Sequence, residues 1–236
     1  DGTLVERSQG TPQGGIVSPV LSNLFLHYVF DKWMDRNHPG NPFCRYADDA
    51  VVHCRTEAEA FALKGKLDAR FRECGLELHP LKTKIAYCKD DLRRKDYSVT
   101  SFDFLGYTFR PRRSKNRNGK FFINFSPAVS NKAGKGMREK ARSWNMHLRS
   151  DKSLEDLSRM FSPVIQGWIN YYGRFYKSAL HPTLRHLNRT LVRWATRKFK
   201  RLKRHRRRAE HWLGIIANRQ PWLFPHWKIG VKPTAG

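Results

Sequence analysis

The apolar positions near the start of the chain recur at helical spacing. Ser18-Pro19 matches the residue preferences of a helix start, with Ser18 as the N-cap, and the cluster at residues 37–40 matches a turn. The apolar residues that share one face between these points are Leu21, Leu24, Phe25 and Tyr28. The pattern therefore predicts a helix that begins at Ser18 and ends before residue 37.

The next stretch, residues 43–54, is mostly apolar but is interrupted at its centre by Asp48 and Asp49. Two short strands joined by a tight turn at the aspartates fit this pattern best. A helix should follow, because Thr56 and Glu59 have the spacing of a capping box and its apolar positions recur at helical spacing.

Strand character returns at residues 76–88, after Gly75, whose position suits the C-terminal end of the preceding helix. A further strand at 102–109 is predicted to pair with 120–125 through the polar loop 114–119. The resulting order of helix, hairpin, helix, strand and hairpin predicts an α+β domain built on an antiparallel sheet.

Beyond about residue 130 the strand signals end and helical patterns dominate. The predicted helices cover 133–149, 153–161, 163–178, 182–204 and 206–218. The apolar stripe of the fourth is formed by Leu187, Leu191, Trp194, Ala195, Phe199 and Leu202. We therefore expect two domains, 1–130 and 131–236, the second all-α.

The distribution of charge narrows the class of partner. The chain has 46 basic and 20 acidic residues, a net charge of +26. Residues 132–236 alone hold 25 basic and 5 acidic residues. Repulsion on that scale opposes compaction unless a polyanion neutralises it, so nucleic acid is the expected partner. An anionic membrane surface is less favoured, because aromatic residues are interleaved with the charges, and no apolar run could span a bilayer.

The cysteines predict neither a metal site nor a disulfide framework. The four residues are irregularly spaced and form no C-x-x-C pair. We expect them to be small core residues in a reducing cytoplasm. They are Cys44, Cys54, Cys74 and Cys88.

The pair Asp48-Asp49 is the main candidate for chemistry. Adjacent carboxylates repel each other, and a divalent cation relieves this repulsion. Mg²⁺ prefers one or two carboxylates completed by water and substrate phosphates. The alternative is an ordinary solvated turn, because aspartate is common in turns.

The motifs around this pair favour the Mg²⁺ site over the solvated turn. Tyr46-Ala47-Asp48-Asp49 resembles the Y-x-D-D box of reverse transcriptases. The residues from Gly10 to Asn23, from Gly75 to Lys84 and from Phe104 to Tyr107 resemble the neighbouring blocks of the group II intron branch, in the family's order. Gln166–Tyr172 and Leu223–Trp227 resemble the maturase thumb. The chain is thus similar to group II intron-encoded reverse transcriptase/maturases over nearly its whole length, which implies part of a polymerase palm followed by a helical thumb.

The resemblance implies a role for each motif. Asp48 and Asp49 would bind the catalytic Mg²⁺ ions of a two-metal site. The resemblance implies that the nucleotide or its template base is bound by Gln13, Gly14, Gly15 and Tyr46. Lys82 would approach the triphosphate. The primer end would be gripped by Phe104, Leu105, Gly106 and Tyr107. Its implied partners are dNTPs, intron RNA and the RNA/DNA primer–template duplex, in a bacterial-type cytoplasm.

A second set of residues is predicted to contact RNA. Acidic partners at i,i+4 are nearly absent around residues 193–208, so contact with phosphates explains this charge run better than a solvated helix face does. The predicted RNA-binding residues are Arg193, Arg197, Lys200, Arg201, Lys203, Arg204, Arg206, Arg207 and Arg208. Four tryptophans of this region are expected to be packing anchors: Trp194, Trp212, Trp222 and Trp227.

The chain also departs from the family pattern. The third metal-binding aspartate and the fingers of family members are not found, and Asp1 is not assigned that role. We therefore expect a fragment that polymerises little or nothing by itself. Two alternatives stay open: a non-catalytic RNA-binding splicing cofactor, and a stand-alone defence or diversity-generating reverse transcriptase.

Overall fold

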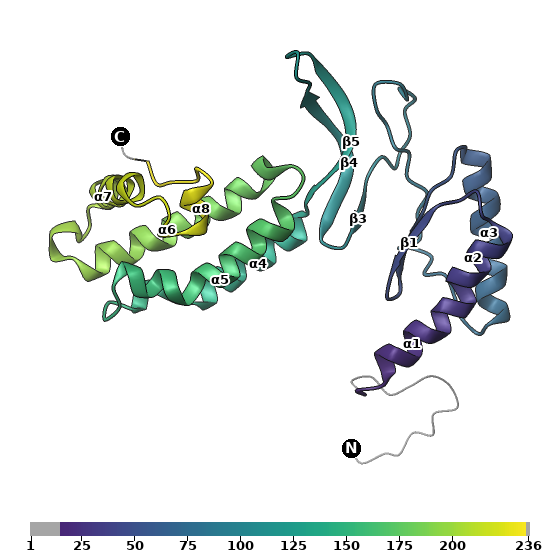
Figure 1. Cartoon of the computed structure of the whole chain (residues 1–236), viewed down its shortest axis with the longest axis horizontal. Coiled ribbons are helices and arrows are strands. Elements are labelled where there is room, and N and C mark those ends of the chain that lie inside the picture. The colour runs from purple at the N-terminus through teal and green to yellow at the C-terminus, as the bar shows by residue number, and fades with distance from the viewer. Residues whose placement is uncertain (1–14, 235–236) are drawn as a thin grey trace. The chain divides into compact units, whose positions relative to one another are not determined.

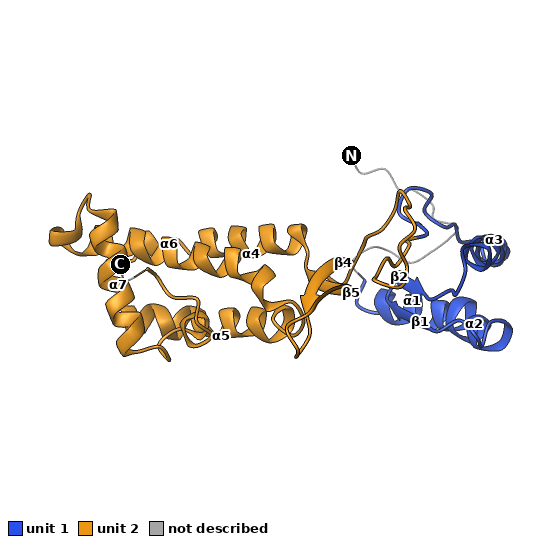
Figure 2. Ribbon diagram, turned by 90° about the horizontal axis from the view of Figure 1, so that it is seen from above, with its two compact units in different colours: residues 1–85 blue, residues 86–236 orange. Residues whose placement is uncertain are grey.

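A computed structural model describes residues 15–234 of the chain. The chain divides into two compact units, Asp1–Ile85 and Ala86–Gly236 (Figure 2). The predicted positions Gln13 and Gly14 lie outside the described residues.

The first unit begins with one continuous helical segment of three parts. These are α1 (Ser18–Leu26), a π-helical stretch (His27–Asp31) and α2 (Lys32–Asn37) (Figure 1). The predicted helix is confirmed, but its N-cap is Val17 and not Ser18. No residue of α1 is buried, whereas Val29, Phe30 and Met34 in the following parts are.

A hairpin and a second helix complete this unit. Strands β1 (Phe43–Tyr46) and β2 (Asp49–Val52) pair antiparallel, as predicted. Helix α3 (Glu57–Glu73) begins at the predicted capping box, in which the Glu59 N–H donates to Thr56 Oγ1 at 3.2 Å. The core consists of Phe30, Met34 and Leu63, with Phe43 and Val52 of the hairpin packed against it.

The second unit contains a three-stranded antiparallel sheet of order β3-β4-β5. Its strands are β3 (Phe102–Phe104), β4 (Tyr107–Lys115) and β5 (Phe121–Val129). The single strand expected at 102–109 is therefore wrong: the chain reverses at Leu105 and Gly106, whose φ values of 50° and 77° are those of a tight hairpin turn.

The strand predicted at 76–88 is also wrong, because this segment is irregular. Tyr87 donates its N–H to the Val99 carbonyl at 2.8 Å, but no ladder of backbone bonds follows. Pro80 removes one donor from the middle of the segment. Alternating apolar residues here are half-buried without forming part of a sheet.

The part of the second unit that follows β5 is helical. Its α-helices are α4 (Asn131–Ser143), α5 (Leu154–Tyr172), α6 (His181–Lys198), α7 (Arg206–Arg219) and α8 (Pro225–Lys228). Short 3₁₀ turns lie at Met146–Leu148, Lys177–Leu180 and Lys200–Leu202. Helix α5 joins two helices that were predicted separately, and Pro163 lies inside it.

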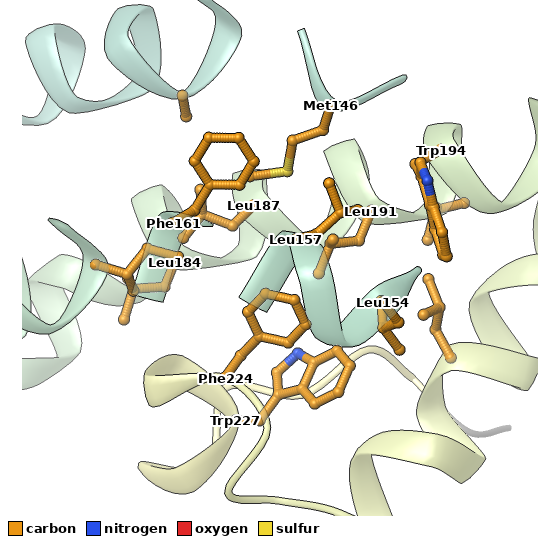
Figure 3. Packing of buried hydrophobic residues seen from close by; sticks show 14 of the residues in the cluster. Met146, Leu154, Leu157, Phe161, Leu184, Leu187, Leu191, Trp194, Phe224 and Trp227 are labelled. Atoms are coloured by element: carbon orange, nitrogen blue, oxygen red, sulfur yellow. The ribbon is translucent and has the colours of Figure 1, made fainter. Parts of the chain in front are cut away.

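The helices enclose one apolar core (Figure 3). The helix predicted at 182–204 is wrong at its C-terminal end, because α6 ends at Lys198 and Phe199 is extended. The apolar stripe is confirmed within α6, where its leucines and Trp194 are buried, and Leu202 of the following 3₁₀ turn is buried as well. Trp194 and Trp227 are buried anchors, as expected. Trp222 is 69% exposed, so its assignment as an anchor is wrong. The cysteines were expected in the core, but Cys44 is exposed and the other three are only partly buried.

The compact units do not coincide with the domains expected at 1–130 and 131–236. The β-sheet belongs with the helices, because Tyr107 donates its hydroxyl to the Tyr171 carbonyl and its ring packs against those of Tyr171 and Tyr172. Within the described residues, no helix is both long enough and apolar enough to cross a membrane.

Candidate functional site

The turn between β1 and β2 carries the predicted acidic pair. Tyr46 pairs with Asp49 in the ladder, so Ala47 and Asp48 form the two-residue loop. Ala47 has φ 53°, in the left-handed region. Asp48 therefore lies in the turn itself, whereas Asp49 is the first residue of β2. Both side chains are exposed, as is Tyr46.

Arg45 holds this turn in place. Its Nε and Nη2 donate to the two carboxylate oxygens of Asp31, each at 2.7 Å. Its Nη1 donates to the Ala47 carbonyl at 2.8 Å and to Asn23 Oδ1 at 3.0 Å. One guanidinium thus fastens the loop that carries Asp48 to the long N-terminal helical segment.

The ion pair between Arg45 and Asp31 shifts the pKa of both groups. The hydrogen bonds from Arg45 lower the pKa of Asp31, against the opposing effect of burial, with a smaller contribution from His27. The bond to Asp31 raises the pKa of Arg45. Only 11% of the Arg45 side chain and 18% of the Asp31 side chain are exposed, so solvent screens the pair weakly.

The acidic pair is chemically suited to a hard cation. The side chains of Asp48 and Asp49 form no ion pair or hydrogen bond with another described residue, so their carboxylate oxygens are available. Carboxylates completed by water and phosphate are the ligands that Mg²⁺ prefers. Among residues 15–234, no group of three or more His, Cys, Asp or Glu side chains gathers in a way that could hold a metal. The two aspartates by themselves are fewer than such a group requires.

Of the other predicted nucleotide contacts that the structure describes, Gly15 and Lys82 are not joined to the turn by any observed bond. Gly15 lies just before α1, where its carbonyl accepts from the Ser18 N–H at 3.2 Å. Lys82 is exposed in an irregular segment. Within the described part of the chain, no hydrogen bond or ion pair joins Lys82 to the aspartates.

The predicted primer-grip residues form the turn between β3 and β4. Phe104 pairs with Tyr107, and the end of α5 supports the turn, because Tyr171 donates its hydroxyl to the Leu105 carbonyl at 3.0 Å. Gly106 is required there: at φ 77°, a Cβ would lie 2.8 Å from the Tyr172 hydroxyl. Burial raises the pKa of Tyr107.

The predicted RNA-binding residues form a set of exposed cations, called here the C-terminal basic surface. All of its members are exposed, and none is ion-paired with a described residue. They are Arg193, Arg197, Lys200, Arg201, Lys203, Arg204, Arg206, Arg207 and Arg208. Lys198 differs, because its ammonium donates to the Ser150 and Lys152 carbonyls at 2.8 Å.

Sequence patterns did not reveal the residues that support the turn. Asp31 and Arg45 lie on different elements, and no local spacing relates them. Asn23 belongs to a motif that was recognised, but its bond to Arg45 was not anticipated. The only local signal was an acidic residue that follows the apolar pair Val29-Phe30.

An exposed acidic hairpin turn and a strongly basic helical unit are both features typical of proteins that act on nucleic acids. Comparison with known families supports this reading for both parts. Residues 3–109 match the family described as "Reverse transcriptase (RNA-dependent DNA polymerase)", and residues 135–212 match the "Group II intron, maturase-specific domain". These two matches lie on separate parts of the chain and together support a group II intron reverse transcriptase/maturase.

One curated relative is Protein YkfC of Escherichia coli (strain K12). It is 29% identical over 143 residues, which cover 46% of this chain and 34% of that protein. The chain thus spans about a third of the length of this relative.

Proposed function

We propose that the protein acts as an RNA-directed DNA polymerase and as a maturase that assists splicing of a group II intron RNA. The family matches over both parts of the chain support this activity. The observation that carries the polymerase role is the turn between β1 and β2, where two exposed carboxylates without partners stand on a hairpin fastened by Arg45.

In this proposal Asp48 and Asp49 hold Mg²⁺. The ions would lower the energy of the charge that develops on the transferred phosphate and help to ionise the primer 3′-hydroxyl. Arg45 acts through the turn: it holds the Ala47 carbonyl and thereby limits the positions that Asp48 can reach. A rigid mount matters because small displacements of a catalytic group reduce rates strongly.

The remaining contacts follow the family pattern. Gln13, Gly14, Gly15 and Tyr46 would lie against the incoming dNTP and its template base, and Lys82 would approach the triphosphate. The turn from Phe104 to Tyr107 would grip the primer end. Residues 1–130 would serve as part of the palm, and 131–236 as the thumb.

The C-terminal basic surface would bind the intron RNA and the primer–template duplex. Its exposed cations without acidic partners can neutralise phosphates and release counterions, so binding should weaken steeply with salt. The same observation favours a second candidate function, a non-catalytic RNA-binding splicing cofactor.

Primer extension on an RNA template tests the polymerase role. We expect Asp48→Asn or Asp49→Asn to abolish extension by the protein expressed from its natural reading frame. Asp35→Asn, which removes an exposed charge from α2 of the same unit, should leave extension unchanged. The isolated 236-residue chain should extend primers little or not at all. Extension that survives loss of both aspartates would refute the polymerase role.

Splicing of the cognate intron RNA separates the two candidate functions. If the protein has both activities, Asp48→Asn should preserve splicing assistance, and charge removal from Arg206, Arg207 and Arg208 should reduce it. A protein that assists splicing but never extends a primer would be the splicing cofactor alone.

A further inference from the structure

The hairpin formed by β4 and β5 carries unbalanced positive charge. The sequence has no acidic residue between Asp103 and Glu139. The basic side chains on the strands and their connecting turn are Arg110, Arg112, Arg113, Lys115, Arg117 and Lys120. None of them forms an ion pair with a described residue. The turn end of this hairpin extends away from the helices of the same unit (Figure 1).

One face of the hairpin combines cations with an aromatic ring. Lys115 pairs with Phe121 and Arg113 with Ile123 in the ladder, so these four side chains share a face. The Arg113 guanidinium lies 3.8 Å from the centroid of the Phe121 ring, and the Lys115 ammonium lies 5.7 Å from it. Arg113, Lys115 and Phe121 are called here the hairpin patch.

The hairpin patch is available to a ligand. Phe121 is 53% exposed, and a shallow pocket of about 370 Å³ opens beside it, lined in part by Arg113, Ile123 and Asp91. The Arg113 side chain makes no hydrogen bond to another described residue. Its guanidinium is therefore held over the ring while its N–H groups stay free to donate.

Addition of a further strand is not the favoured mode of binding at this place. Asp91 already covers the edge of β5 at Ile123, donating its N–H to the Ile123 carbonyl at 3.3 Å and accepting from the Ile123 N–H at 3.1 Å. Recognition should therefore occur through side chains on the face of the hairpin rather than through its backbone.

We propose that the hairpin patch binds a single-stranded polynucleotide. An unpaired base stacks on the Phe121 ring, and Arg113 and Lys115 contact the adjoining phosphates. An exposed aromatic ring among cations favours a single strand over a duplex, because a duplex keeps its bases stacked on one another. This site is separate from the C-terminal basic surface, and it rests on the proposed function only in taking RNA as the natural source of the strand.

Binding of labelled oligonucleotides of about 12 nucleotides to the 236-residue chain tests this site. We expect Phe121→Leu to weaken single-strand binding about tenfold, the cost of losing one stacked base, without changing its dependence on salt. Arg113→Gln should reduce the slope of log K against log salt by about 0.7, the value for one phosphate contact on a single strand.

The chain provides matched controls for both changes. Phe61 of α3 is 60% exposed, so Phe61→Leu removes a comparable ring elsewhere. Arg110 alternates to the opposite face of the same hairpin, so Arg110→Gln removes the same charge from the wrong side. Phe121→Tyr keeps the ring and should retain binding, which separates stacking from any loss of folding.

Each outcome has a defined meaning. If Phe121→Leu and Arg113→Gln match their controls, the hairpin patch is not a binding site. Equal losses with duplex RNA would refute the preference for single strands, and binding of anionic vesicles in place of oligonucleotides would identify a membrane surface instead. Comparison of RNA with DNA of the same sequence identifies the source of the strand. If the unaltered chain binds no RNA at all, the proposed maturase function fails rather than this assignment alone.

Discussion

Replacing Arg45 with lysine keeps the positive charge but removes the planar fork that joins Asp31 to the loop carrying Asp48. Lysine presents a single ammonium on a flexible stem and cannot reproduce the paired 2.7 Å contacts to Asp31. The bond to the Ala47 carbonyl should be lost at the same time. The hairpin should therefore open more readily, even though the net charge is unchanged.

The expected size of the effect follows from the bonds removed. A hydrogen bond to a charged group contributes about 1.5–3 kcal/mol and one to a neutral group about 0.5–1.5 kcal/mol. Lysine retains one charged contact, so only part of this sum is lost. We therefore expect Arg45→Lys to lower the free energy of opening of the hairpin by about 2 kcal/mol.

Hydrogen exchange of the backbone amides in β1 and β2 measures this opening directly. A loss of about 2 kcal/mol should accelerate exchange roughly 30-fold. Arg72→Lys is the matched control, because Arg72 pairs with Asp68 at 2.8 Å on the exposed surface of α3, where such pairs contribute less than about 1 kcal/mol.

Catalysis by the protein from its natural reading frame provides a second measurement. Arg45→Lys should lower kcat more than it raises KM, because Arg45 positions the turn and does not touch the substrate. Exchange rates in β1 and β2 equal to those of the unaltered protein would refute the claim that Arg45 holds the turn. So would an effect no larger than that of Arg72→Lys.

Three further predictions concern the second unit. Gly106→Ala should destabilise this unit by about 2 kcal/mol in urea unfolding, because the residue has φ 77° and an added Cβ would meet the Tyr172 hydroxyl. Gly119→Ala is the control and should cost only about 1 kcal/mol, because that residue has a similar φ of 81° but only the flexible Lys115 side chain lies nearby. Burial lowers the pKa of His226 from 6.5 to about 3. Below pH 6.5 this imidazole therefore becomes protonated in the unfolded chain but stays neutral in the folded chain. Stability should therefore fall by about 2 kcal/mol between pH 7.5 and 5, and melting of His226→Phe should not show this loss. Replacing Arg206, Arg207 and Arg208 with glutamine should reduce the slope of log K against log salt for duplex binding by about 2–3, and an unchanged slope would contradict phosphate contact by these residues.

Local sequence signals predicted the elements that depend on neighbours along the chain. The capping box of Thr56 and Glu59 begins α3, and the turn at Asp48 interrupts an apolar stretch as expected. The apolar stripe of α6 was also predictable, because a core-facing helix repeats its buried positions every three or four residues. The exposure of the cations at 193–208 followed from the scarcity of acidic partners.

Features set by contacts distant in sequence were not predictable in the same way. The ion pair between Asp31 and Arg45 joins a helical segment to a strand, and neither residue carries a local signal for the other. The turn at Leu105-Gly106 was read as part of a strand, because apolar residues flank it on both sides. Trp222 was assigned to the core by residue type alone, although its position leaves most of the ring in solvent.

The π-helical stretch His27–Asp31 has a consequence for how the long N-terminal helical segment tolerates change. A π turn holds more residues than an α turn, so side chains beyond it are rotated relative to those before it. Asp31, which pairs with Arg45, is the last residue of this stretch, so the direction of its side chain depends on the π turn. Substitutions that favour a regular helix between residues 18 and 37 should turn this carboxylate away from Arg45. Higher helical propensity in this segment should therefore weaken the contacts that hold the turn carrying Asp48.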